Sequence, residues 1–188
     1  MRISSAFVVA LAVAGCGRGG VPQGATGLPG ETGATGLQGE TGAVGPLGVR
    51  PFGYFFALMP GDNSATIALG GSVDFPQNGA ANGIFRVGVI ADEFVLPAIG
   101  FYEVSWQVSI TEAGQLVLAL NGVELPRTTS GRATLTTQIM NDVIVETTVA
   151  NTVLSIRNPA AAAAALTVTP SAGGASAVSA SLVIKQLQ

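Results

Sequence analysis

The chain has 188 residues, of which 10% are charged and 48% are hydrophobic, and it contains one cysteine and no histidine. Without histidine it cannot build a Ser-His-Asp triad, a Cys-His dyad or a histidine-ligated zinc site. The formal net charge is -3, and the eight basic residues occur singly along the chain, which argues against nucleic-acid binding. A single cysteine also excludes a disulfide within the chain.

Residues 1–16 have the organisation of an export signal. Arg2 precedes an apolar run over residues 6–14, and the small residue Gly15 follows the run. This order matches a charged region, a hydrophobic region and a cleavage site. The run is shorter than the ~20 apolar residues that a membrane-spanning helix needs, so we expect the chain to be exported without a transmembrane anchor.

The end of this signal contains the cysteine. The tetrapeptide Val-Ala-Gly-Cys at residues 13–16 resembles the bacterial lipobox. The resemblance implies that Cys16 is acylated, becomes the first residue of the mature protein and supplies its contact with a membrane. Two alternatives stay open: ordinary cleavage after Ala14, which leaves an exposed thiol, and no cleavage at all. A short linker over residues 17–23 follows.

Residues 24–50 are a triplet repeat. Glycine occupies every third position from Gly24 to Gly48 without exception. Only glycine fits at the crowded axis where three polyproline-like chains meet, so the period predicts a collagen-like triple helix made by three copies of the chain. The alternative is a flexible glycine-rich linker, which would not require the period. With proline only at Pro29 and Pro46, the isolated stalk should be marginally stable.

Four triplets carry threonine in the third position, where side chains point outward. By resemblance to bacterial collagens these threonines suit O-glycosylation, and the alternative is simple solvated polarity. They are Thr26, Thr32, Thr35 and Thr41.

Residues 51–188 are predicted to form an all-β head large enough to bury a core. Residues 102–111 alternate apolar and polar side chains without a break, which predicts a strand with one buried face. Residues 116–120 lead into Asn121-Gly122, a dipeptide favoured in two-residue hairpin turns, and the returning strand should stop at Pro126.

Further strands are expected from short β-branched and aromatic runs between turn residues. Many short strands of this spacing favour a β-sandwich or jelly roll. The alanine run over residues 160–165 is too short for a stable helix and is predicted to be a loop or a packed strand edge. The further candidates are residues 54–58, 65–69, 84–90, 93–96, 134–140, 143–149, 152–156, 166–169 and 178–187.

Several of these segments are apolar on both faces, most clearly residues 116–120, 143–145 and 182–184. A sandwich on its own buries one face of each sheet. The excess is explained if some outer faces pack against neighbouring subunits, as in obligate oligomers. Both the head and the stalk therefore predict self-association, and the stalk sets the number at three, which makes a homotrimer.

Three sequence segments of the head carry a family resemblance. With the stalk before them, they resemble the collagen-like glycoproteins of bacterial spore exosporia, the BclA type, whose head is similar to those of the complement recognition subunit and tumour necrosis factor. The resemblance implies a ten-stranded jelly roll, a compact homotrimer and a surface filament or adhesin. Exosporium members usually begin with a different leader, so cell surface and spore surface both stay open. The three segments are residues 98–104, 116–123 and 181–185.

The function favoured by these features is structural and adhesive, with no catalytic constellation, no cofactor and no metal. The adjacent acids Asp92 and Glu93 would point to opposite faces of a strand and could not flank one substrate. One alternative is a head that binds a host receptor or glycan, through a pocket or calcium site in the polar loops at residues 62–64 and 78–82, although such loops are commonly turns. The other alternative is a phage fibre tip.

The lipobox resemblance gives the first prediction. Mass spectrometry of the membrane-extracted protein should find an acylated Cys16 at the N-terminus, and Cys16→Ser should release the protein from the membrane fraction. An N-terminus elsewhere, an unmodified thiol, or an unchanged location of Cys16→Ser would contradict it.

Overall fold

The computed structural model describes residues 20, 23–31, 33, 48–58, 61–63, 66–135, 137–169 and 178–188. The chain divides into two compact units, Met1–Gly45 and Pro46–Gln188. The described residues of the first unit are exposed and have no helix or strand, and Thr26 is among them. Cys16, Thr32, Thr35 and Thr41 lie outside the described residues. No helix in the described part of the chain is long and apolar enough to cross a membrane.

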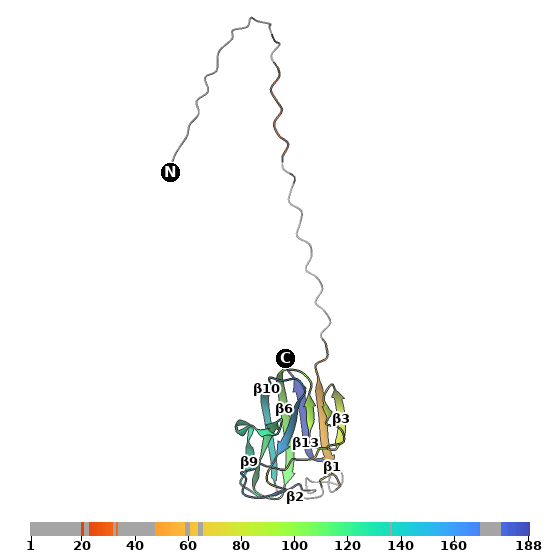
Figure 1. Cartoon of the computed structure of the whole chain (residues 1–188), viewed down its shortest axis with the longest axis vertical. Coiled ribbons are helices and arrows are strands. Elements are labelled where there is room, and N and C mark those ends of the chain that lie inside the picture. Colours follow the sequence, from red (N-terminus) through yellow and green to blue (C-terminus); the bar gives the residue numbers. More distant parts are fainter. Residues whose placement is uncertain are drawn as a thin grey trace, which may run out of the picture. The chain divides into compact units, whose positions relative to one another are not determined.

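The second unit is a sandwich of two antiparallel sheets (Figure 1). The five-stranded sheet has the order β10-β6-β13-β1-β3. The larger sheet has the order β4-β5-β11-β7-β8, with β9 also paired to β7, and β12 pairs with β2 in a short ribbon.

The bounds of the strands are as follows. The five-stranded sheet contains β1 (Phe52–Leu58), β3 (Gln77–Asn82), β6 (Gly100–Ile110), β10 (Thr137–Thr147) and β13 (Val178–Gln186). The larger sheet contains β4 (Phe85–Arg86), β5 (Phe94–Leu96), β7 (Gly114–Leu120), β8 (Val123–Glu124), β9 (Ser130–Arg132) and β11 (Thr152–Arg157). The ribbon is β2 (Thr66–Ile67) with β12 (Leu166–Thr167), and one 3-10 helix, η1, spans Pro126–Thr128.

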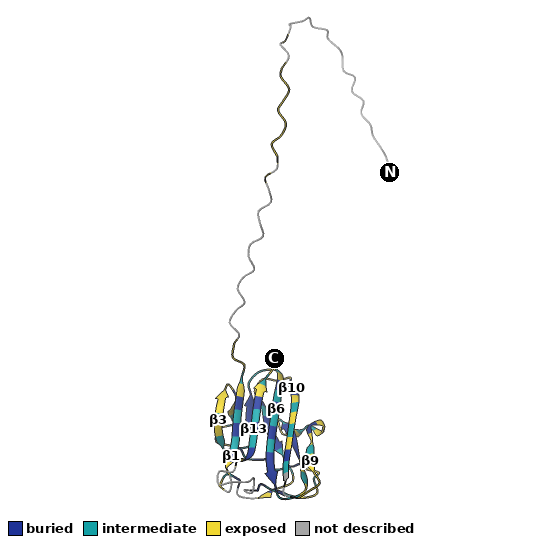
Figure 2. Ribbon diagram, turned by 180° about the vertical axis from the view of Figure 1, so that it is seen from behind, coloured by how far each residue is buried: buried dark blue, intermediate teal, exposed yellow. Residues whose placement is uncertain are grey.

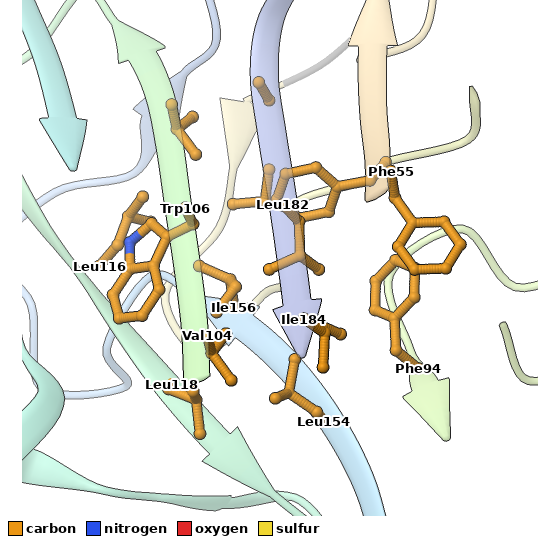
Figure 3. Close-up of a cluster of buried hydrophobic side chains, with 14 of the residues drawn as sticks. Phe55, Phe94, Val104, Trp106, Leu116, Leu118, Leu154, Ile156, Leu182 and Ile184 are labelled. Atoms are coloured by element: carbon orange, nitrogen blue, oxygen red, sulfur yellow. The ribbon is translucent and has the colours of Figure 1, made fainter. Parts of the chain in front are cut away.

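The alternation in β6 builds one wall of the core, as the sequence predicts. From Tyr102 onward, every second residue of this strand is at most 2% exposed, and Trp106 is the largest of them. These side chains meet Leu116 and Leu118 of β7 and the aliphatic residues of β11 across the gap between the sheets (Figure 3). The buried members of β6 are Tyr102, Val104, Trp106, Val108 and Ile110.

The predicted hairpin is also confirmed. Asn121 and Gly122 both have positive φ, 50° and 79°, as a type I′ turn requires, and glycine takes the second of these angles without steric cost. The turn sets β8 beside β7, with Leu120 opposite Val123. The returning strand ends before Pro126, where η1 begins.

Other predictions need correction. Residues 134–140 and 143–149 were expected to be two strands, but β10 runs through Asn141 and Asp142 without a break. Asn141 is opposite Trp106, and its side-chain amide donates to the carbonyl of Thr128, so this polar pair sits within a ladder and does not form a turn. The structure describes thirteen strands, more than the ten implied by the family resemblance.

Strands β3 and β9 were not predicted because their sequences have no apolar face. Residues 78–82, expected to be a polar loop, belong to β3, which pairs with β1 at the edge of its sheet. Only one side of an edge strand has a partner, so a polar sequence is tolerated there. The alanine run over residues 160–165 is a loop in the structure, as expected.

The two-faced apolar strands differ in what covers them. In β7, Val117 and Ala119 are buried within one chain. The segment after the hairpin lies along this strand, where the Leu118 amide donates to Thr128 Oγ1 at 3.0 Å. The outer side of β7 is therefore not one of the faces that need a neighbouring subunit to bury them. In β10, by contrast, Ile144 is 61% exposed.

The core assignment gives a stability prediction. Leu118→Ala should destabilise the head by about 2–5 kcal/mol, because it removes buried methyl groups and leaves a cavity between the sheets. Val123→Ala is the matched control, since Val123 is 67% exposed in the adjacent strand and should change stability by less than about 0.5 kcal/mol. Urea unfolding followed by tryptophan fluorescence measures both, and equal effects would contradict the core assignment.

Candidate functional site

The outward side of the five-stranded sheet is the most distinctive surface of the head, and we call it the outer sheet face. Successive side chains of a strand point to opposite sides, so this face takes every second residue of four strands, which the burial colours show as teal and yellow between dark blue (Figure 2). Its members are Phe52, Tyr54 and Phe56 of β1, Phe101, Glu103, Ser105 and Gln107 of β6, Met140, Asp142, Ile144 and Glu146 of β10, and Ser181, Val183 and Lys185 of β13.

The β1 side of the outer sheet face is aromatic. The rings of Tyr54 and Phe56 stack with their centroids 5.4 Å apart and their planes 22° apart, and Phe52 is 36% exposed. Gly79 of β3 supports this arrangement, because a Cβ at that position would collide with the Tyr54 ring. The dipeptide Asn78-Gly79 thus makes room for an aromatic side chain and does not form a loop pocket.

The middle of the same face is hollowed. Ser105 and Ser181 have short side chains, and with Met140 and Val183 they line a hollow of about 380 Å³. A second, largely apolar hollow of about 350 Å³ lies at the start of β1. It is lined by Arg50, Pro51, Phe52, Gly53, Tyr54, Ala80, Val183, Lys185 and Gln186.

The opposite edge of the outer sheet face belongs to β10 and carries exposed apolar and acidic side chains. Ile144 is 61% exposed and Met140 is 50% exposed. The acidic residues Asp142 and Glu146 lie on the same side of this strand. Lys185 of β13 and Glu103 of β6 form an ion pair of 3.0 Å across adjacent strands. At this exposure such a pair contributes little to stability.

A third hollow, of about 610 Å³, lies at the other end of the sandwich. β6 runs from Gly100, beside the end of the chain, to Ile110, and the hollow opens beyond Ile110. Its only charged lining residue is Arg132, whose Nε donates to the carbonyl of Gln138 at 3.1 Å. The other lining residues are Ala113, Gly114, Gln115, Gly131, Ala133 and Ala161, Ala162, Ala163 and Ala164.

The nearest acid in the sequence to this third hollow already has hydrogen-bond donors. Burial alone would raise the pKa of the Glu112 carboxyl, but hydrogen bonds from the backbone and side chain of Thr167 and from the hydroxyl of Thr111 hold that pKa below its usual value. The Thr167 amide is 2.7 Å from Glu112 Oε2. Glu112 is therefore ionised and bonded to its own chain at neutral pH, and it does not pair with Arg132.

The polar loop at residues 62–64 has the contacts of a turn in its described part. The Asp62 carboxylate accepts hydrogen bonds from the Leu58 amide and the Gln77 side chain, and the Asn63 side chain bonds both backbone groups of Asp74. Burial, and then the charge of Asp92, raise the pKa of Asp74. Among the described residues there is no group of three His, Cys, Asp or Glu side chains that could hold a metal ion.

The outer sheet face was not predicted as a site from the amino-acid sequence. The available signal was in residues 52–58, where Phe52, Tyr54 and Phe56 alternate with Phe55 and Ala57. Apolar residues at both even and odd positions show that both sides of the strand are apolar. They do not show which side faces the core.

The fold and its surfaces define the class of protein: an all-β, two-sheet head preceded by a glycine-triplet segment. The model of the BclA C-terminal domain family matches residues 55–188. The chain therefore belongs to the BclA C-terminal domain family.

Solved structures give further similarities. The globular domain of zebrafish complement 1qA protein is 10% identical, with 72% of this chain and 94% of that chain covered and a TM-score of 0.48. Murine APRIL at pH 5.0 is 14% identical, with 73% and 99% covered and a TM-score of 0.49. The PRD1 vertex protein P5 is 13% identical, with 75% and 99% covered and a TM-score of 0.44. A comparison with curated proteins found no match.

Proposed function

We propose that this protein is a non-catalytic surface protein that works as a homotrimer, with the head driving trimerisation and carrying a collagen-like stalk. The observation that carries the proposal is the outer sheet face. Its aromatic row on β1 and its exposed Ile144 on β10 leave apolar side chains on the surface of one monomer. Monomers seldom expose such a surface unless it binds a partner.

The glycine period supports three copies as that partner. The repeat from Gly24 to Gly48 is the period of a triple helix, in which only glycine fits at the axis that three chains share. Because β1 begins at Phe52, four residues after Gly48, three chains that meet at the end of the stalk bring their β1 strands near one another. The aromatic side of the outer sheet face starts on this strand.

The same proposal covers location and modification. The export signal and the lipobox resemblance support a protein displayed on a surface, anchored by acylation of Cys16. Membership of the BclA C-terminal domain family favours a spore surface. Thr26, which is exposed, is a candidate for O-glycosylation together with Thr32, Thr35 and Thr41. In this position the protein would act as a filament or adhesin.

The trimer is tested on the second compact unit, residues 46–188. Light scattering should give the mass of three chains, and Tyr54→Glu should give monomers because it places a charge in the aromatic row. Val123→Glu is the matched control, because Val123 is also exposed but lies on the other sheet, and it should remain trimeric. A wild-type unit that is monomeric at micromolar concentration would contradict the proposal.

A second candidate function, ligand binding, is favoured by the third hollow. Its volume of about 610 Å³ is in the range of small-molecule sites. Arg132 is its only charged lining residue, and the Nε contact with Gln138 holds the guanidinium in place. A guanidinium binds carboxylates with charge-assisted hydrogen bonds. A small carboxylate, such as an acidic sugar, is therefore the kind of ligand that we propose for this hollow.

Titration with glucuronate, followed by NMR chemical shifts, tests the second candidate. Glucuronate should shift signals around Arg132 while neutral glucose does not, and Arg132→Gln should weaken the binding by about tenfold or more. Arg127→Gln, a change of the same kind in η1, should have no effect. Equal shifts with glucose, or unchanged binding by Arg132→Gln, would remove the candidate.

A further inference from the structure

The third hollow is lined mainly by methyl groups. Six of its ten lining residues are alanine, and four of these form the unbroken run over residues 161–164, which we call the alanine wall. An alanine side chain is a single methyl group without a polar atom. In the described part of the chain, Gln115 and Arg132 are the only lining residues with a polar side chain. A ligand held at Arg132 therefore meets a surface that favours apolar groups.

The alanine wall is held at both ends by side chains of other residues. Just before the wall, the Ala160 amide donates to Glu124 Oε1 at 2.8 Å. At its end, the Ala164 carbonyl accepts a hydrogen bond from Asn158 Nδ2 at 3.0 Å, and Asn158 is fully buried. Because the loop is already fixed, a ligand that contacts the wall does not have to order it, which lowers the entropic cost of binding.

The backbone of the alanine wall has free hydrogen-bond donors. The Ala162 amide donates to the carbonyl of Pro159 at 3.0 Å. The amides of Ala161, Ala163 and Ala164 have no acceptor in the described part of the chain, and these three residues are exposed. An acetamido group on a ligand has a carbonyl oxygen that accepts hydrogen bonds from such amides. The wall therefore offers both methyl groups and amide donors.

Gln115 is placed at the hollow by the pairing of β7 with β9. It lies opposite Gly131, and a Cβ on Gly131 would lie 2.5 Å from Gln115 Cγ. Glycine at this position therefore leaves room for the Gln115 side chain. The side-chain amide of Gln115 has no hydrogen-bond partner in the described part of the chain, so it is free to bond the hydroxyl groups of a sugar.

We propose that the third hollow binds carboxylated sugars that carry an N-acetyl group in preference to those that lack one. The inference rests on the second candidate function, in which Arg132 binds the carboxylate, and it adds what the rest of the hollow recognises. The acetyl methyl lies against the alanine wall, the acetyl carbonyl accepts from the free amides of the wall, and Gln115 bonds sugar hydroxyls. An acid without the acetyl group leaves the methyl groups and the amides of the wall without a ligand partner.

The test compares three sugars on the full chain with Cys16→Ser, which removes the thiol. N-acetylneuraminate carries both a carboxylate and an N-acetyl group. Its deaminated analogue has a hydroxyl in place of the acetamido group, and N-acetylglucosamine has the acetamido group but no carboxylate. Isothermal titration calorimetry measures the affinities, and saturation-transfer NMR identifies the ligand protons that contact the protein.

Two variants of the same chain locate the contact. Ala163→Leu fills space in front of the alanine wall, and because Ala163 is exposed the head should keep its fold. Ala150→Leu is the matched control, since Ala150 is exposed in the turn between β10 and β11, at the Gly100 end of the sandwich. Far-UV circular dichroism verifies that both variants are folded.

N-acetylneuraminate should bind at least about fourfold more tightly than its deaminated analogue, because it buries one more methyl group. The acetyl methyl protons should receive the strongest saturation. Ala163→Leu should reduce this preference to less than about twofold and leave the affinity for the analogue within about threefold of the parent, since only the acetyl contact is lost. Ala150→Leu should keep the full preference.

Equal affinities for N-acetylneuraminate and its analogue would overturn the inference, and so would an unchanged preference in Ala163→Leu. Either result would leave a carboxylate site at Arg132 in place. The second candidate function itself would be rejected if neither acid binds, or if N-acetylglucosamine binds as tightly as N-acetylneuraminate.

Discussion

The packing of apolar side chains across the gap between the two sheets is the interaction on which the rest of the head depends. Trp106 of β6 lies against Leu116 and Leu118 of β7 (Figure 3) and is 2% exposed. On the other side Phe55 and Phe94 join the sheets, with ring centroids 4.5 Å apart. Because both sheets turn their apolar sides inward to make these contacts, the opposite sides of the same strands are set at once.

That constraint explains why the outer sheet face exists. With Phe55 and Ala57 committed to the core, the neighbouring aromatic residues of β1 have no interior position left and must face outward. In the larger sheet the corresponding outward side chains of β7, Val117 and Ala119, are already buried within one chain. No equivalent segment among the described residues covers Ile144 or the aromatic row, and a second copy is the cover that we propose.

The predicted stalk would be marginally stable by itself, and a trimeric head would offset this. A nine-triplet repeat with two prolines must order every residue at a cost of roughly 1–2 kcal/mol each, and three separate chains would rarely meet. A head that trimerises first would tether the three chains at one end and raise their effective concentration. In the proposed assembly the head would therefore set the register, and the triple helix would extend from Gly48 toward Gly24.

Sequence alone determined the features that depend on local chemistry. The glycine period, the strand over residues 102–111 and the Asn121-Gly122 turn each follow from steric limits or alternation within a few residues. Tertiary structure decided the features that depend on distant partners. β10 continues through Asn141 because the long strand β6 pairs with it along its whole length, and β3 forms because β1 offers it a free edge. Whether a two-faced apolar strand is covered by its own chain, as β7 is, or left open, as β10 is, depends on where segments far away in the sequence come to lie, which no local pattern contains.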